Sequence, residues 1–135
     1  MIQRLSTVEI QAKLPAWEWL AALFIDNKLS ESEYKNIAFH LSQTNYSISS
    51  LEAMMTNEIG PIFINNINGK APFPETVVFT RNDVLEIMER HYDRLNGINR
   101  FLLTAFQADP LKKNKTLKQR WSIVKNELHK LGVPS

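Results

Sequence analysis

The chain has 135 residues, 44% of them hydrophobic and 10% aromatic, which suits one globular domain with a single core and excludes a disordered segment. It contains no cysteine, which excludes disulfides, thiolate nucleophiles and cysteine metal sites. The net charge is only +2, but residues 1–99 carry 8 basic and 12 acidic side chains, whereas residues 100–135 carry 8 basic and 2 acidic ones. Such a separation of charge favours a partner with an oppositely charged face.

No segment of the sequence resembles a membrane span or a secretory signal. The longest clean apolar run is Leu20–Ile25, far shorter than the roughly 20 residues that cross a bilayer. The first residues, MIQRLSTVEI, lack the apolar centre of a signal peptide. We therefore expect a cytoplasmic protein.

Two helices are predicted before residue 44. Ser6 followed by Glu9 is a capping-box pattern, and Pro15 either kinks the helix that follows or begins its main part. Apolar residues then recur at helical spacing, at Trp17, Leu20, Ala21 and Phe24, with a second stripe at Trp19 and Leu23. A helix that is apolar around most of its circumference is usually central and buried. A second capping box, at Ser30 and Glu33, precedes another helical stripe of Tyr34, Ile37, Ala38 and Leu41.

The third predicted helix runs from about residue 48 to residue 67, after a cap at Ser47 or Ser49. Asn68-Gly69 and the β-branched residues 76–79 would suit a β-hairpin. The apolar residues nevertheless keep helical spacing through the middle of this stretch, at Met55, Ile59, Ile62, Phe63 and Ile67. Pro61 removes a backbone donor and crowds the carbonyl of the residue four before it. We therefore predict a helix broken at Gly60-Pro61, followed by an irregular loop over residues 68–79.

The second half of the chain is also predicted to be helical. Thr80 and Asp83 can cap the next helix, whose face is formed by Val84, Ile87, Met88, His91 and Leu95. A further stripe covers Ile98, Phe101, Leu102 and Ala105, and residues 109–115 are interpreted as a surface connection. The last helix has the clearest pattern, with Leu117, Trp121, Val124, Leu128 and Leu131 on one face and Gly132 as its stop. The sequence therefore predicts a single all-α domain over residues 1–135, a compact bundle of five to six helices.

The sequence shows no catalytic or metal-binding pattern. None of His40, His91 and His129 has a second His or Cys at metal-ligand spacing. Glu52 and Glu58 could act as an acid–base pair only if one of them were buried, and we expect both to face solvent. There is no nucleophile elbow, phosphate loop or dinucleotide fingerprint. We therefore expect a protein that is not an enzyme and that needs no metal and no cofactor.

A basic stretch near the C-terminus provides one hypothesis, a regulatory protein that associates with nucleic acid. Its residues are Lys112, Lys113, Lys115, Lys118 and Arg120, followed by Trp121. Lysines and an arginine can contact phosphates, and a tryptophan can stack on bases. Trp121, however, lies on the apolar stripe of its helix, so we expect it in the core.

Three stretches of the first half carry recognisable motifs: PAWEWLAALFIDNKL (15–29), IAFHLSQTNYSISSLEAMM (37–55) and NEIGPIFINNI (57–67). They resemble a family of small bacterial proteins catalogued as a domain of unknown function. That family has a Trp, then Leu-Phe-Leu-Asp, a Ser-Leu-x-Glu-Leu helix, Glu-Val-x-Pro and an Asn-Leu pair. The matching positions are Trp17, Leu23, Phe24, Asp26, Leu51, Glu52, Glu58, Pro61 and Asn66. The family continues with a Gly-Glu-Trp segment where this chain has NGKAPFPE (68–75), so the departure falls on the loop.

The resemblance implies a small helical bacterial protein, and such proteins often lie beside toxin genes as immunity proteins. The leading hypothesis is therefore an immunity-type protein that binds a cognate toxin tightly and occludes its active site. The expected contacts are the acidic edge and the loop, at Asp26, Glu31, Glu33, Asn68, Lys70 and Phe73. The acidic edge presumes a cationic, nuclease-like toxin; an acidic toxin would instead meet the basic stretch. The heptad-like spacing of the last helix also leaves a homodimer open.

Overall fold

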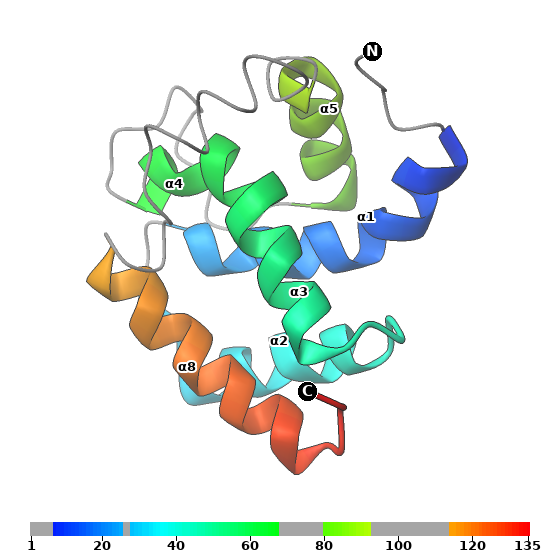
Figure 1. Ribbon diagram of the computed structural model, residues 1–135. Coiled ribbons are helices and arrows are strands. Elements are labelled where there is room, and N and C mark those ends of the chain that lie inside the picture. Colours follow the sequence, from blue (N-terminus) through cyan, green and yellow to red (C-terminus); the bar gives the residue numbers. More distant parts are fainter. Residues whose placement is uncertain (1–6, 26–27, 68–79, 93–113) are drawn as a thin grey trace.

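The computed structural model describes residues 7–25, 28–67, 80–92 and 114–135, and their regular structure is entirely helical (Figure 1). The elements in chain order are α1 (Thr7–Ala21), η1 (Ala22–Phe24), α2 (Glu31–Ser42), α3 (Ile48–Met54), η2 (Met55–Ile59), α4 (Gly60–Ile67), α5 (Arg81–Tyr92) and α8 (Lys115–Lys130). The predicted all-α fold is thus confirmed. Within these ranges, no helix is both long and apolar enough to cross a membrane.

Helix α1 occupies the centre of the fold, as its continuous apolar surface predicts. It packs against α2, α5 and η2, and α3 crosses it (Figure 1). The side chains of Trp17, Leu20 and Ala21 are almost completely buried. Pro15 lies inside α1 and not at its first turn, since the helix begins at Thr7. Burial on several sides explains why α1 has no distinct polar face.

The predicted broken helix is present with the predicted bounds, and its break takes the form of a π-helical turn. Segment η2 is π-helical, and the amide of Gly60 donates to the carbonyl of Met55, five residues earlier. The wider turn lies directly before Pro61, whose ring would crowd the carbonyl four residues back in a regular α-helix and which has no amide hydrogen to donate. The chain therefore stays helical through Gly60-Pro61, and the break is a change of direction in which α4 leaves the line of α3 (Figure 1).

Short polar residues begin the helices. Ser30 and Glu33 form the reciprocal capping box that the sequence predicts. Thr80 and Asp83 form a similar pair: the amide of Thr80 donates to Asp83 Oδ2 at 3.0 Å, and the amide of Asp83 donates to Thr80 Oγ1 at 3.1 Å. Ser47, and not Ser49, accepts from the amide of Ser50 to cap α3. Asn114, which we assigned to a surface connection, caps α8 by accepting from Leu117 at 2.9 Å.

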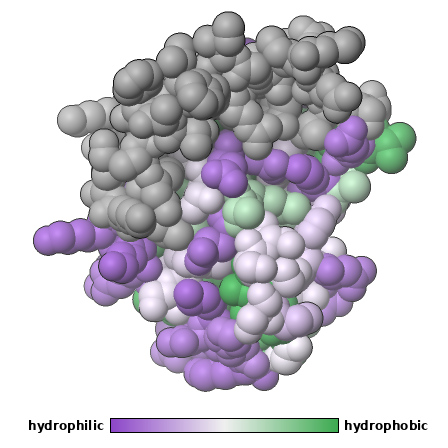
Figure 2. Space-filling view, viewed as in Figure 1, coloured by the Kyte–Doolittle hydropathy of each residue, from purple (hydrophilic) through white to green (hydrophobic). Residues whose placement is uncertain are grey.

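Helix α8 closes the core, mainly by packing on α2. Leu117, Trp121, Val124 and Leu128 are buried, as predicted, whereas Leu131 is 49% exposed because the helix has ended there. Gly132, with φ +82°, forms the predicted stop, and the amide of Val133 donates back to Leu128. The carbonyl of Pro134 then accepts from the amide of Ile48, which ties the chain end to α3. Figure 2 shows mostly hydrophilic side chains over this part of the surface.

Several predictions concern residues outside the described ranges. They are the irregular loop over residues 68–79, the stripe at Ile98–Ala105, and the side chains of Asp26, Asn68, Lys70, Phe73, Lys112 and Lys113.

Candidate functional site

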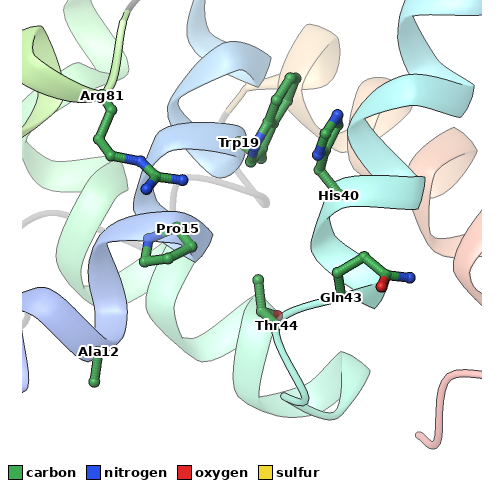
Figure 3. A pocket seen from close by; sticks show the side chains of 7 residues that line it. All are labelled: Ala12, Pro15, Trp19, His40, Gln43, Thr44 and Arg81. Atoms are coloured by element: carbon green, nitrogen blue, oxygen red, sulfur yellow. The ribbon is translucent and has the colours of Figure 1, made fainter.

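A cavity of about 290 Å³ opens where α1, the end of α2 and the first residue of α5 meet (Figure 3). Its lining combines apolar, aromatic and polar side chains. They are Ala12, Pro15 and Trp19 of α1, His40 of α2 with Gln43 and Thr44 just after it, and Arg81 of α5. Figure 3 shows Arg81 on one side of the space and the Trp19–His40 pair on the other.

An aromatic ladder leads from this cavity to the protein surface. The rings of Trp19 and His40 are stacked, with centroids 4.0 Å apart and planes inclined by 1°. The ring of Phe39 meets His40 edge-on, with centroids 5.5 Å apart. Phe39 is 50% exposed and is one of three large apolar side chains that are exposed among the described residues, with Val8 and Leu131. The ladder thus presents a hydrophobic ring that its neighbours hold in place.

Some of the donors that line the cavity have no acceptor among the described residues, whereas Gln43 and Thr44 donate to Ser42 and to the carbonyl of Leu41. Arg81 donates through Nε to Glu18 at 2.9 Å, and its two terminal nitrogens have no acceptor among the described residues. The indole nitrogen of Trp19 and the ring nitrogens of His40 also have no hydrogen-bond partner within the described part of the chain. The other two tryptophans differ, since the indoles of Trp17 and Trp121 each donate to a glutamate. No aspartate or glutamate is among the described residues that line the cavity.

The expected acidic edge lies at the start of α2. Glu31 is exposed and forms an ion pair with Lys35 at 3.4 Å, one turn further along. Glu33 is also exposed, and its carboxylate accepts from the amide of Ser30 at 3.0 Å. Hydrogen bonds from the Ser30 amide and hydroxyl lower the pKa of Glu33, because they stabilise its charged form. Glu33 therefore has a structural task in addition to any contact with a partner.

One residue of the predicted basic stretch, Arg120, is buried in the structure. Lys115 and Lys118 are exposed on α8. Arg120 is only 7% exposed, and its Nη1 donates to the carbonyls of Leu23 and Ile25, both at 2.8 Å. The interpretation of Arg120 as a phosphate contact is therefore corrected: its guanidinium holds α8 against the end of η1.

The expectation that both Glu52 and Glu58 face solvent is wrong for Glu58. Glu58 is only 7% exposed, and its carboxylate accepts from Trp17 Nε1 at 2.9 Å and from Lys13 Nζ at 2.6 Å. Glu52 is partly exposed and accepts from Trp121 Nε1 at 2.7 Å. Both carboxylates thus bond to core tryptophans on neighbouring helices.

A repeated spacing in the sequence accompanies these two contacts. Lys13 precedes Trp17 by four residues, and Lys125 follows Trp121 by four, so each tryptophan has a lysine one helical turn away. Lys13 pairs with Glu58 as described, and Lys125 lies 4.0 Å from Glu52. The spacing alone does not say which acids the two pairs meet, since those lie 41 and 69 residues from the tryptophans.

The described part of the chain offers no metal centre, because it contains no group of three or more His, Asp and Glu side chains that could share an ion. His40 stacks on Trp19, and His129 is exposed at the end of α8.

Comparison with known proteins places the chain in a family. It belongs to the family described as a domain of unknown function, DUF7079, whose model matches residues 11–127. This range extends well beyond the motifs within residues 15–67 and reaches into α8. No curated protein and no solved structure matches the chain. The family carries no stated activity, so function has to be argued from the residues.

Proposed function

We propose that this member of the DUF7079 family is a binding protein of the immunity type, which neutralises a bacterial toxin by forming a tight complex that occludes the toxin's active site. The observation that carries the proposal is the aromatic ladder of Phe39, His40 and Trp19. Protein interfaces draw most of their affinity from a few aromatic or arginine side chains that fill pockets on the partner. Phe39 is such an anchor.

The ladder lowers the cost of binding. A flexible side chain loses rotamer freedom when a partner immobilises it, at about 0.5–1.5 kcal/mol per side chain. Phe39 rests edge-on against His40, which in turn is stacked on the partly buried Trp19. We expect this contact to restrict the ring in the free protein, so that less entropy is lost in the complex.

The outer face of α2 has the arrangement of an interface around this anchor. Glu31, Lys35 and Phe39 are spaced by four residues, so they lie along one side of the helix, and all three are exposed. The two charged residues lie on one side of the exposed apolar ring, and interfaces commonly border their apolar anchors with polar side chains. Glu31 and Glu33 at the start of α2 add negative charge, which would speed association with a cationic toxin.

The experiment co-expresses this protein with a toxin-like product encoded by a neighbouring gene and measures cell survival. The proposal expects the wild-type protein to abolish toxicity and to form a complex with the toxin. Toxicity that persists although both proteins are soluble, for every toxin-like neighbour, would defeat the immunity role.

A matched pair of variants then tests the surface. Phe39→Ala should weaken the complex by at least about 30-fold, the effect of a side chain worth about 2 kcal/mol. Leu131→Ala is the control, because Leu131 is exposed to the same degree but lies at the end of α8. Calorimetric titration of the purified pair gives both values. Equal affinities for Phe39→Ala and the wild type would show that the toxin binds elsewhere.

A further inference from the structure

We propose that the cavity between α1, α2 and α5 is a binding site for a small molecule that carries an oxyanion, a carboxylate or a phosphate. This inference concerns a ligand and not the toxin, and it stands whether or not the immunity role is correct. It rests on the volume of the cavity and on the donors that line it; among the described residues the lining contains no acidic side chain, and Glu18 contacts Arg81 from outside the lining.

The donors converge on the cavity from two sides. The Arg81 guanidinium extends into it from the start of α5, opposite Trp19 and His40 (Figure 3). Two terminal nitrogens of Arg81, the indole nitrogen of Trp19 and the ring nitrogens of His40 have no hydrogen-bond partner among the described residues. A guanidinium with two free terminal nitrogens suits the paired oxygens of a carboxylate or phosphate.

Arg81 is held in position by another residue. Its Nε donates to Glu18 Oε1 at 2.9 Å, and the Glu18 side chain is only 20% exposed. This bond uses the one nitrogen that is not needed for a paired contact, and it fixes the direction of the guanidinium. The charge of Glu18 also offsets part of that of Arg81, so a monovalent or divalent anion would bind with moderate affinity.

The remaining lining determines the rest of the ligand. Ala12 and Pro15 supply an apolar wall, while Gln43 and Thr44 border the opposite side. A volume of about 290 Å³ lies just below the usual range of small-molecule sites, roughly 300–1,000 Å³. The site therefore fits one anionic group on a small apolar body, such as a single ring.

The test titrates the full-length protein with benzoate, phenyl phosphate and the neutral benzyl alcohol, up to about 10 mM, and follows tryptophan fluorescence and NMR shifts. The proposal expects saturable binding of at least one anion and at least tenfold weaker binding of benzyl alcohol. The two anions decide between carboxylate and phosphate. If neither anion saturates, or if the alcohol binds equally well, the proposal is overturned.

Two variants and a control locate the ligand. Arg81→Gln should weaken anion binding at least tenfold, whereas Arg90→Gln should leave it unchanged. Arg90 lies on the same helix, is similarly exposed and is similarly paired, with Glu86 at 2.7 Å, but it does not line the cavity. Trp19→Phe keeps a ring against His40, removes the indole donor and should weaken binding severalfold. Equal losses for the two arginine variants, or none in Arg81→Gln and Trp19→Phe, would contradict the assignment.

Discussion

Replacing Glu58 by alanine tests the buried contact between α1 and η2. In the folded protein the carboxylate accepts from Trp17 Nε1 at 2.9 Å and from Lys13 Nζ at 2.6 Å. Trp17 is 1% exposed, so water cannot easily replace the acceptor that its indole would lose. Lys13 would lose its counter-ion while its side chain is only 25% exposed.

The magnitude follows from these exposures. Removing one partner of a fully buried ion pair costs about 3–5 kcal/mol, and a buried donor left without its acceptor costs about 1–3 kcal/mol. The two costs overlap, and Lys13 can partly turn towards water. We therefore expect Glu58→Ala to lower the free energy of unfolding by about 3 kcal/mol.

The assay is urea unfolding followed by circular dichroism, which reports on all helices and does not depend on the altered environment of Trp17. With a slope of about 2 kcal/mol per molar urea, the midpoint should fall by about 1.5 M. Glu58→Gln keeps an oxygen for the indole and should cost roughly half as much. Glu52→Ala is the matched control, since its carboxylate also accepts from a tryptophan but its side chain is 41% exposed; we expect a loss of about 1 kcal/mol.

The comparison between the two glutamates decides the outcome. If Glu58→Ala is no more destabilising than Glu52→Ala, the argument that burial makes this contact strong is refuted. A loss in Glu58→Gln as large as in Glu58→Ala would show instead that the charge pair with Lys13, and not the indole bond, dominates.

Three further predictions concern helix ends and the α8 anchor. Arg120→Met should lower the free energy of unfolding by about 3 kcal/mol, because two buried carbonyls lose their donor. Lys118 is exposed on the same helix, so Lys118→Met should change it by less than about 0.5 kcal/mol in the same urea assay. Gly132→Ala should lower the free energy of unfolding by about 1 kcal/mol in a thermal assay, because an added Cβ meets nothing within 4 Å and only the φ of +82° opposes it. Asparagine tolerates this φ, so a similar loss in Gly132→Asn would argue against that cause. The lowered pKa of Glu33 adds stability that is present above its unfolded pKa and is lost as the pH falls through the folded value. Glu33→Gln should therefore flatten the dependence of stability on pH between about pH 5 and 3. The change should be no more than about 0.5 kcal/mol, because the group is exposed. An unchanged pH profile would mean that the capping box does not persist in solution.

Local signals carried most of the fold prediction. A side chain that caps a helix bonds to an amide only two or three residues away, so Ser30, Ser47 and Thr80 could be recognised from their immediate neighbours. The same applies to the break near Pro61, because the clash of its ring is with its own helix. What the sequence did not show is that the chain would absorb that clash in a π-helical turn and continue as a helix.

Only some of the candidate binding residues could be predicted from the sequence. Glu31 and Glu33 lie on the surface at the start of α2, where a capping box places them. The cavity was not predicted, since Pro15, His40 and Arg81 come from three helices and share no spacing pattern. His40 is ordinary as an isolated helix residue, and its place between Phe39 and Trp19 becomes visible only when α1 and α2 are packed together.

The sequence by itself determined the helical periodicity and most of the caps, since each depends on neighbours within about one helical turn. It also determined the unequal distribution of charge, which is a matter of composition alone. Only the tertiary structure decided which polar groups are buried and which are free. Glu58 and Arg120 look like surface residues in the sequence, yet each lies in the core because donors or acceptors from another helix satisfy it. Trp19 looks like a core residue, yet it lines a cavity with its indole nitrogen unpaired among the described residues. Burial and pairing depend on the relative placement of helices far apart in the chain, and that placement is not encoded in any single stretch of it.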